Sequence, residues 1–198
     1  MFTGIIKNLG KIEEVVTKKD GAYITVVSSV ATSLIEGASL AVNGVCLTVL
    51  SNTKHAAVFR LMNETLKCTN IGQLRAGDVV NLEQPLTASQ PIDGHFVLGH
   101  VDGIATVTSI KIVKMDKIFT LRPPKSLLRY LIPKGSVALD GVSLTVVDVA
   151  DATFTVSMMP YTLSHTLFGQ VNESYEVNLE VDVLGKYVVR LHEQNTKK

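Results

Sequence analysis

The sequence predicts an all-β protein of two tandem homologous antiparallel barrels followed by a C-terminal α-helix, on three observations. First, residues 43–49 (NGVCLTV) return as residues 140–146 (DGVSLTV), an offset of 97, and NLE at 81–83 returns at 178–180. A repeat of about a hundred residues has the size of a whole small domain. Second, each copy contains many short strand patterns between Gly-rich turns, which is typical of a small closed barrel. Third, an apolar stripe with helical spacing follows the second copy.

The duplication divides the 198 residues into three predicted parts. Residues 1–86 form the first barrel, residues 95–182 form the second, and residues 183–198 form a helix and tail. The stretch 85–94 is rich in Pro, Thr, Ser, Gln, Asp and Gly and offers little to bury. Such a composition predicts a linker between the barrels.

In the first copy, alternating apolar and polar residues predict strands that turn residues separate. A short helix is expected at 29–36, with Ser29 as its cap and Gly37 as its end. A helical turn is expected at 64–71, ended by Gly72. The predicted strands are 2–6, 10–16, 23–27, 45–49, 56–61 and 78–83.

The second copy starts at residues 95–103, which align loosely with residues 2–6. In this alignment His100 takes the place of Ile5. An amphipathic helix is expected at 125–132, between two prolines and a Pro-Lys-Gly turn. The predicted strands of this copy are 105–110, 117–121, 142–146, 153–158 and 175–181.

The stripe beyond the second copy has no counterpart in the first. Its members are spaced i, i+3, i+4, i+7, as on one face of a helix: Leu184, Tyr187, Val188 and Leu191. Two interpretations are open. The helix docks on its own barrel, or it mediates self-association.

The repeated stretch reads as a tight turn followed by a half-buried strand, because Asn-Gly and Asp-Gly tolerate positive φ angles. Under strand alternation Cys46 and Thr48 share one face. Ser143 and Thr145 occupy the matching face of the second copy. Small thiol and hydroxyl groups at a strand's start could line a pocket. The alternative is a tolerated polar pair beside a barrel core.

Composition excludes several classes of function. The net charge is +1 with scattered Lys and Arg, so nothing indicates a nucleic-acid surface. Although 46% of residues are hydrophobic, no run approaches the roughly 20 apolar residues of a membrane span, and we expect no membrane association. The N-terminus lacks the apolar core of a signal peptide. Cys46 and Cys68 fit free thiols, which predicts a cytoplasmic protein.

Taken together and in order, these motifs resemble the riboflavin synthase family of the α-chain type. The motifs that carry the resemblance are MFTGI at the N-terminus, NGVCLTV at 43–49, ETL at 64–66, GHF at 94–96 with GHV at 99–101, and DGVSLT at 140–145. No single motif is diagnostic, but their joint occurrence within a duplicated frame is highly specific.

The resemblance implies six-stranded Greek-key barrels and a C-terminal helix that holds a homotrimer together. It implies a transferase reaction in which two 6,7-dimethyl-8-ribityllumazine molecules exchange a four-carbon unit. The products are riboflavin and 5-amino-6-(D-ribitylamino)uracil. No metal or other cofactor is implied, and a possible further partner is lumazine synthase. The alternative function is that of a non-catalytic lumazine or flavin carrier, an antenna protein of the same fold.

The resemblance also implies two substrate pockets, each of which borrows the initial segment of the opposite copy. The first comprises Cys46, Leu47, Thr48, Arg60, Leu61, Met62, Asn63, Glu64, Thr65, Gly99, His100, Val101 and Lys134. The second comprises Gly4, Ile5, Ile6, Ser143, Leu144, Thr145, Ser157, Met158, Met159, Pro160, Tyr161 and Thr162, and Asp182 completes the set. Two similar pockets suit a reaction that holds two identical molecules face to face.

The hypothesis for catalysis takes His100, Cys46 and Ser143. The donor's 7-methyl group must lose a proton, and histidine titrates in the useful range. Cys46 is a thiolate nucleophile, a proton relay or a pocket wall, and Ser143 bonds or adds to the acceptor ring. Asp140 is expected to orient that ring. The remaining candidates are interpreted as structural: His95, Cys68 and His165.

Overall fold

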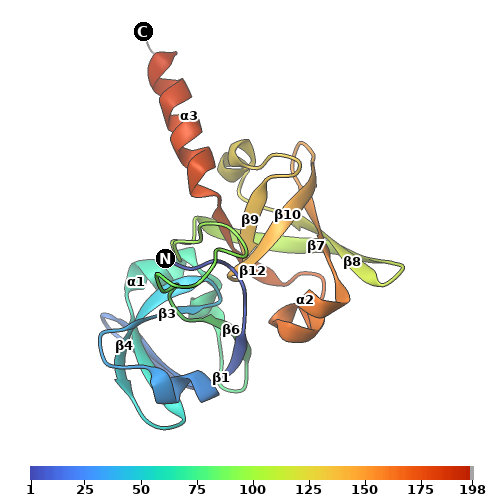
Figure 1. Cartoon of the computed structure of the whole chain (residues 1–198). Coiled ribbons are helices and arrows are strands. Elements are labelled where there is room, and N and C mark those ends of the chain that lie inside the picture. The colour runs from blue at the N-terminus through green and yellow to red at the C-terminus, as the bar shows by residue number, and fades with distance from the viewer. Residues whose placement is uncertain (197–198) are drawn as a thin grey trace.

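Each copy of the repeat folds into a closed antiparallel barrel, and a helix extends from the end of the second (Figure 1). The computed structural model describes residues 1–196. The first barrel consists of β1 (Asn8–Lys18), β2 (Gly21–Val27), β3 (Ser39–Val42), β4 (Val45–Asn52), β5 (Ala56–Leu61) and β6 (Val79–Glu83). The second consists of β7 (Gly103–Val113), β8 (Asp116–Arg122), β9 (Ser136–Leu139), β10 (Val142–Val149), β11 (Phe154–Met158) and β12 (Glu176–Val181).

The two barrels have the same strand order, and both are Greek keys. The first runs β1-β2-β5-β4-β3-β6, and the pairing of β6 with β1 closes it. Strands β3, β4 and β5 follow one another as neighbours, and β6 returns to lie beside β3, which is the Greek-key connection. The second barrel runs β7-β8-β11-β10-β9-β12 and closes in the same way. The predicted fold class is confirmed.

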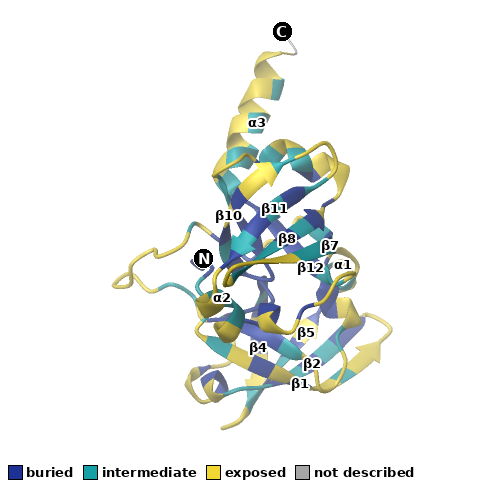
Figure 2. Cartoon of the chain, turned by 90° about the vertical axis from the view of Figure 1, so that its right-hand side faces the viewer, coloured by how far each residue is buried: buried dark blue, intermediate teal, exposed yellow. Residues whose placement is uncertain are grey.

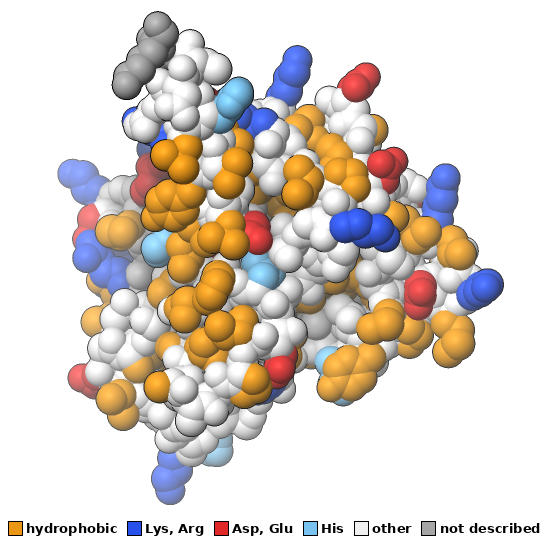
Figure 3. Space-filling model, turned by 45° about the horizontal axis from the view of Figure 1, so that its top comes forward, with side chains coloured by type: hydrophobic (Ala, Val, Ile, Leu, Met, Phe, Trp, Pro, Cys, Tyr) orange, Lys and Arg blue, Asp and Glu red, His pale blue; other side chains and the backbone are white. Residues whose placement is uncertain are grey.

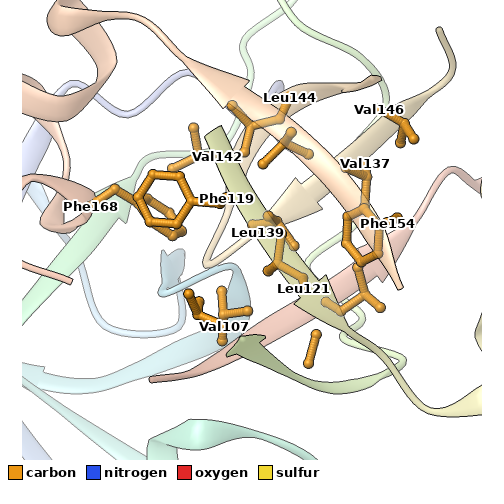
Figure 4. Packing of buried hydrophobic residues seen from close by; sticks show 14 of the residues in the cluster. Val107, Phe119, Leu121, Val137, Leu139, Val142, Leu144, Val146, Phe154 and Phe168 are labelled. Atoms are coloured by element: carbon orange, nitrogen blue, oxygen red, sulfur yellow. The ribbon is translucent and has the colours of Figure 1, made fainter. Parts of the chain in front are cut away.

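Buried residues alternate with more exposed ones along the strands (Figure 2), and the buried side chains form an apolar core in each barrel. In β4 the exposed fractions of Val45, Leu47 and Val49 are 5%, 5% and 2%. In the second barrel the rings of Phe119 and Phe168 pack edge to face, with centroids 5.8 Å apart, in a core of aliphatic side chains (Figure 4). Each buried side chain of this size stabilises the fold by about 1.5–3 kcal/mol.

The initial segments of the two copies meet between the barrels. The N–H of Phe2 donates to the carbonyl of Val97 at 2.7 Å, and the N–H of Val97 donates back at 3.2 Å. Phe2 itself is fully buried. The predicted strand at 2–6 is wrong beyond this single bridge, because the residues after it turn to other partners.

The two signature turns also meet at this seam. Asn43 and Gly44 have φ angles of 44° and 74°, and Asp140 and Gly141 have 41° and 79°. Paired positive φ angles are what a tight hairpin turn requires. A Cβ on Gly44 would lie 2.5 Å from the backbone nitrogen of Gly141, so only glycine allows the turns to touch.

Several predicted helices take a different form. The segment predicted at 29–36 is a 3₁₀ helix, Ser29–Ser33, and its cap is Ser28. The one predicted at 125–132 is also 3₁₀, Lys125–Tyr130. Segments this short can take either form, since α-helices and 3₁₀ helices of five or six residues both occur in this fold. Elements that were not predicted or were bounded differently include β3, β9, α1 (Asn63–Cys68), α2 (Pro160–His165) and the 3₁₀ helices Asn70–Gln73 and Leu167–Gly169.

The C-terminal helix α3 (Val183–Asn195) projects from the second barrel, and most of its surface is exposed (Figure 2). Its base contacts the 3₁₀ helix Lys125–Tyr130, and Arg129 pairs with Glu193. The stripe nevertheless stays open, since Leu184, Tyr187, Val188 and Leu191 are 58–67% exposed. The stripe therefore does not dock on its own barrel. Among residues 1–196, no helix combines the length and apolarity that a membrane crossing needs.

Candidate active site

Ser143 lies at the start of β10, where the N-terminal segment of the chain crosses to the second barrel. The N–H of Ser143 donates to the carbonyl of Gly4 at 2.8 Å. Gly4 has a φ of +78°, and a Cβ there would lie 2.6 Å from the Cβ of Ser143. The close approach leaves no room for any other residue at position 4. The first-copy glycine is thus fitted to the second-copy strand.

The first barrel repeats this arrangement with the roles of the copies exchanged. The N–H of Cys46 donates to the carbonyl of Gly99 at 2.9 Å. Gly99 has a φ of +79°, and a Cβ there would lie 2.6 Å from the Cβ of Cys46. His100 follows at once and is exposed. The structure therefore brings together the two glycine segments and the two signature strands that the resemblance grouped.

The two places are not chemically equal. Beside Ser143, the ring nitrogen Nδ1 of His95 lies 2.7 Å from the serine Oγ. Burial lowers the pKa of His95, while the charge of Asp182 acts weakly in the opposite direction. The lowered pKa favours the neutral imidazole, which is the form that can accept a proton. In the first barrel the position that corresponds to Ser143 carries a thiol, Cys46.

His95 is the residue that sequence analysis interpreted as structural and that the structure places at Ser143. Comparison of the two copies could not single it out. The offset at this end of the repeat is 95 residues, because β1 and β7 both have 11 residues and begin at Asn8 and Gly103. The counterpart of His95 would thus precede Met1. Only the GHF motif at 94–96 hinted at it.

Two short helices flank these strands and present different side chains. In α2, Tyr161 stacks on His165 with ring centroids 4.1 Å apart, and Tyr161 is 70% exposed. In α1, the thiol of Cys68 donates to a carboxylate oxygen of Glu64 at 3.2 Å. A flat heterocycle could stack on the aromatic pair and not on the acidic one. The flanking helices add to the asymmetry.

Some predicted pocket residues turn away from the surface. Half-buried Cys46 and Ser143 and exposed Thr48 and Thr145 lie on the open faces of their strands. By contrast, four side chains lie inside the barrel cores and could offer only their backbone to a ligand: Leu47, Leu61, Leu144 and Met158.

Asp140 does not orient a ligand ring, which corrects the expectation for this residue. Its side chain is 0% exposed and lies in the seam between the barrels. The carboxylate accepts hydrogen bonds from the backbone N–H of Asn178 at 2.9 Å, Asn70 Nδ2 at 2.8 Å and the Tyr175 hydroxyl at 2.8 Å. Burial raises its pKa to about 7, against the opposing effect of these donors.

Lys134 stands apart from the other residues predicted for the first pocket. Lys134 belongs to the second barrel, where its N–H donates to the carbonyl of Val146 at 2.8 Å. Arg60, by contrast, is exposed on β5, where the antiparallel register sets it opposite Thr48 of β4, and it pairs with Asp20 at 2.9 Å. Asp182 caps α3 by accepting the N–H of Leu184 at 3.0 Å.

Comparison with known proteins agrees with this architecture. The lumazine binding domain family matches residues 3–85 and again 98–182. The chain is 40% identical over 200 residues to a riboflavin synthase of Bacillus subtilis, covering 100% of this chain and 93% of the relative. It is 40% identical over 189 residues to that of Actinobacillus pleuropneumoniae, covering 95% and 88%. It is 38% identical over 196 residues to that of Schizosaccharomyces pombe, covering 98% and 94%.

Solved structures show the same fold at lower identity. LumP complexed with 6,7-dimethyl-8-(1'-D-ribityl) lumazine superposes with a TM-score of 0.83 at 22% identity, covering 91% of this chain and 99% of that one. LumP complexed with riboflavin gives a TM-score of 0.84 at 24% identity with the same coverage. With two matches of the domain and full-length relatives of one name, the chain belongs to the lumazine-binding family of riboflavin synthases.

Proposed function

We propose that this chain catalyses the dismutation of two 6,7-dimethyl-8-ribityllumazine molecules into riboflavin and 5-amino-6-(D-ribitylamino)uracil. The observation that carries the proposal is the pair of homologous but unequal sites. Cys46 with Gly99 and His100 forms one, and Ser143 with Gly4 and His95 forms the other. Two identical substrates with different roles, donor and acceptor, need such a pair. Holding both in reacting geometry removes much of the entropic cost of a bimolecular step.

The chemistry requires a base for the donor's 7-methyl proton. Burial lowers the pKa of His95 and so favours its neutral form, which can accept a proton directly or through the Ser143 hydroxyl. His100 is the corresponding candidate beside Cys46. The residues of both predicted pockets that reach the surface are proposed to bind the ring and the ribityl hydroxyls.

Incubation with the lumazine alone tests the function. We expect riboflavin fluorescence to appear without any added cofactor, together with the aminouracil in equal amount. A carrier or antenna protein of the same fold would bind the lumazine and leave it unchanged. Binding without turnover would therefore contradict the proposed enzyme activity and favour the carrier function.

We expect His100→Ala and Cys46→Ala each to lower turnover at least about tenfold while the fold is kept, as for a positioned acid–base or nucleophilic group. Steady-state rates and circular dichroism of the two variants check this. Cys68→Ser is the matched control, because this thiol is exposed and a serine hydroxyl can keep its hydrogen bond to Glu64. Rates close to wild type in both variants would remove His100 and Cys46 from the catalytic residues.

The active assembly is proposed to be a homotrimer in the cytoplasm, with lumazine synthase as a possible partner. Exposed apolar side chains on one face of α3 support self-association (Figure 3). The site is proposed to form between a first barrel and the second barrel of a neighbouring chain. In that arrangement a neighbour's Lys134 could approach Cys46, which the fold of a single chain does not bring about.

Truncation after Asp182 is expected to dissociate the trimer and reduce activity with it. The cut removes Leu184, Tyr187, Val188 and Leu191, whose burial in an interface contributes about 1.5–3 kcal/mol each. Sedimentation velocity and turnover of the truncated chain measure the effect. A matched variant that ends at Asn195 should remain trimeric. A chain cut after Asp182 that still sediments as a trimer would show that α3 does not hold the assembly.

A further inference from the structure

Two buried glutamates occupy equivalent places at the ends of the closing strands, in the repeated NLE motif. Glu83 ends β6 of the first barrel and is 8% exposed. Glu180 lies in β12 of the second barrel and is 4% exposed. No catalytic role was assigned to either. Since carboxylates are rarely buried without partners, their hydrogen bonds indicate what holds them there.

Glu83 binds the N-terminal segment that crosses to the second barrel. One carboxylate oxygen accepts the N–H of Thr3 at 2.7 Å and its hydroxyl at 2.8 Å. The other oxygen accepts the N–H of Gly4 at 2.9 Å. The carbonyl of Gly4 then accepts the N–H of Ser143, and the carbonyl of Thr3 accepts the N–H of His95 at 3.1 Å. A single residue therefore separates the Glu83 carboxylate from each polar residue of the second site. Gly4 lies between it and Ser143, and Thr3 lies between it and His95.

Glu180 does the same in the opposite direction. Its two oxygens accept the N–H of Leu98 at 2.7 Å and that of Gly99 at 3.0 Å. The carbonyl of Gly99 accepts the N–H of Cys46 in the first barrel. Each carboxylate therefore accepts the backbone N–H of a glycine, and the carbonyl of that glycine accepts an N–H from the signature strand of the other barrel.

We propose that Glu83 and Glu180 are positioning residues that act crosswise, from one barrel on the site of the other. Glu83 of the first barrel fixes the Gly4 segment, which completes the second-barrel site. Glu180 of the second barrel fixes the Gly99 segment, which completes the first-barrel site. The donors they accept are backbone N–H groups, so each carboxylate sets the position of main chain, and with it of Gly4 or Gly99. Hydrogen bonds to an ionised acceptor are short and strong, which suits a group that must hold a segment still. For the reaction, this inference rests on the proposed function.

The substitutions that test the inference are Glu83→Gln and Glu180→Gln. Glutamine keeps the volume but replaces one accepting oxygen by an NH₂ group, so the two oxygens can no longer both accept a backbone N–H. Ser143 and Cys46 are suitable places for a reporter thiol. Cys46 serves as the natural reporter in a Cys68→Ser background, and Ser143→Cys serves as the other in a background without either native cysteine.

The measured quantity is the rate at which a small alkylating reagent labels each reporter. We expect Glu180→Gln to raise labelling of Cys46 about fivefold or more by loosening Gly99, and to leave the reporter at position 143 unchanged. Glu83→Gln should do the reverse. Equal responses of both reporters to either variant, or no response, would overturn the crosswise assignment. If a glutamine variant fails to fold, the Asp variant, which retains the charge but withdraws it by one methylene, is measured in its place against the same outcomes.

Turnover of riboflavin is measured separately, so the inference and the proposed function can fail independently. Labelling reports the position of the glycine segments even in a chain that makes no riboflavin. Glu83→Gln combined with Cys46→Ala should lower turnover by the product of the single effects, because the two substitutions act on different pockets. Glu83→Gln combined with Ser143→Ala should cost less than the product. A strictly multiplicative cost in both pairs would overturn the assignment as well.

Discussion

Asp140→Asn is expected to stabilise the fold above neutral pH by about 4 kcal/mol, with a gain that vanishes near pH 4. Asp140 is fully buried between the barrels, and burial raises its pKa from 3.8 to about 7. A carboxyl group whose folded pKa exceeds its unfolded pKa binds more protons in the folded state. Its contribution to stability is therefore complete below pH 3.8 and is lost as the pH rises through 7.

Asparagine at this position retains the hydrogen-bond pattern of the protonated acid. Its carbonyl oxygen accepts from the N–H of Asn178 and from Asn70, and its NH₂ group faces the hydroxyl of Tyr175. Burial raises the pKa of Tyr175 further, so that hydroxyl stays protonated. The first copy already has this amide, since Asn43 accepts the N–H of Asn81 at 2.8 Å in the equivalent place.

Urea unfolding at fixed chain concentration, repeated from pH 4 to 8, measures the difference between wild type and Asp140→Asn. Tyr175→Phe is the matched control. It removes the hydroxyl that donates to the Asp140 carboxylate, which should raise the pKa of Asp140 further, so that stability is lost at a higher pH than in the wild type. A difference that does not change with pH would mean that Asp140 is ionised throughout. In that case the three hydrogen-bond donors stabilise the Asp140 carboxylate by more than its burial destabilises it.

The barrels could be predicted because their signals are local. Apolar alternation in β4 and β10 and the paired turn residues 43–44 and 140–141 depend only on neighbouring residues. The short strands β3 and β9 were missed because each has four residues, too few for alternation to stand out, and no hairpin turn precedes them. Periodicity also could not separate a 3₁₀ turn from a short amphipathic helix at 125–132.

The candidate site could be predicted only in part, because its composition depends on which copy each segment joins. The strand faces with Cys46 and Ser143 follow from alternation. The grouping of Gly4 with Ser143 depends on how the barrels dock, and only the resemblance implied it. The same docking buries Asp140, which reads in the sequence as one more turn residue beside a pocket. His95 was interpreted as structural because the repeat contains no residue to compare with it.

The signature strands of both barrels start at the seam, and they offer a test of the proposed arrangement of sites between chains. Gly44 and Gly141 touch there, and β4 and β10 lead from this contact into different barrels (Figure 1). If the first barrel of one chain faces the second barrel of a neighbour, each site takes its two pockets from different chains. Cys46→Ala then damages only first-barrel pockets, and Ser143→Ala damages only second-barrel pockets.

Mixing these two impaired variants is expected to restore activity. A Ser143→Ala chain supplies a sound first barrel and a Cys46→Ala chain supplies a sound second barrel. In an equal mixture with free exchange, about a quarter of the sites combine the two and carry no lesion. Turnover should therefore rise severalfold above either parent, toward about a quarter of the wild-type rate, from a base at least about tenfold below it.

The control mixes Cys46→Ala with the double variant Cys46→Ala/Ser143→Ala, which contains no sound first barrel and should recover nothing. Size-exclusion chromatography of differently tagged chains shows that subunits have exchanged. If both pockets of a site came from one chain, every site in the mixture would keep a lesion. Mixed assemblies that have exchanged but are no faster than their parents would therefore place the whole site within a single chain.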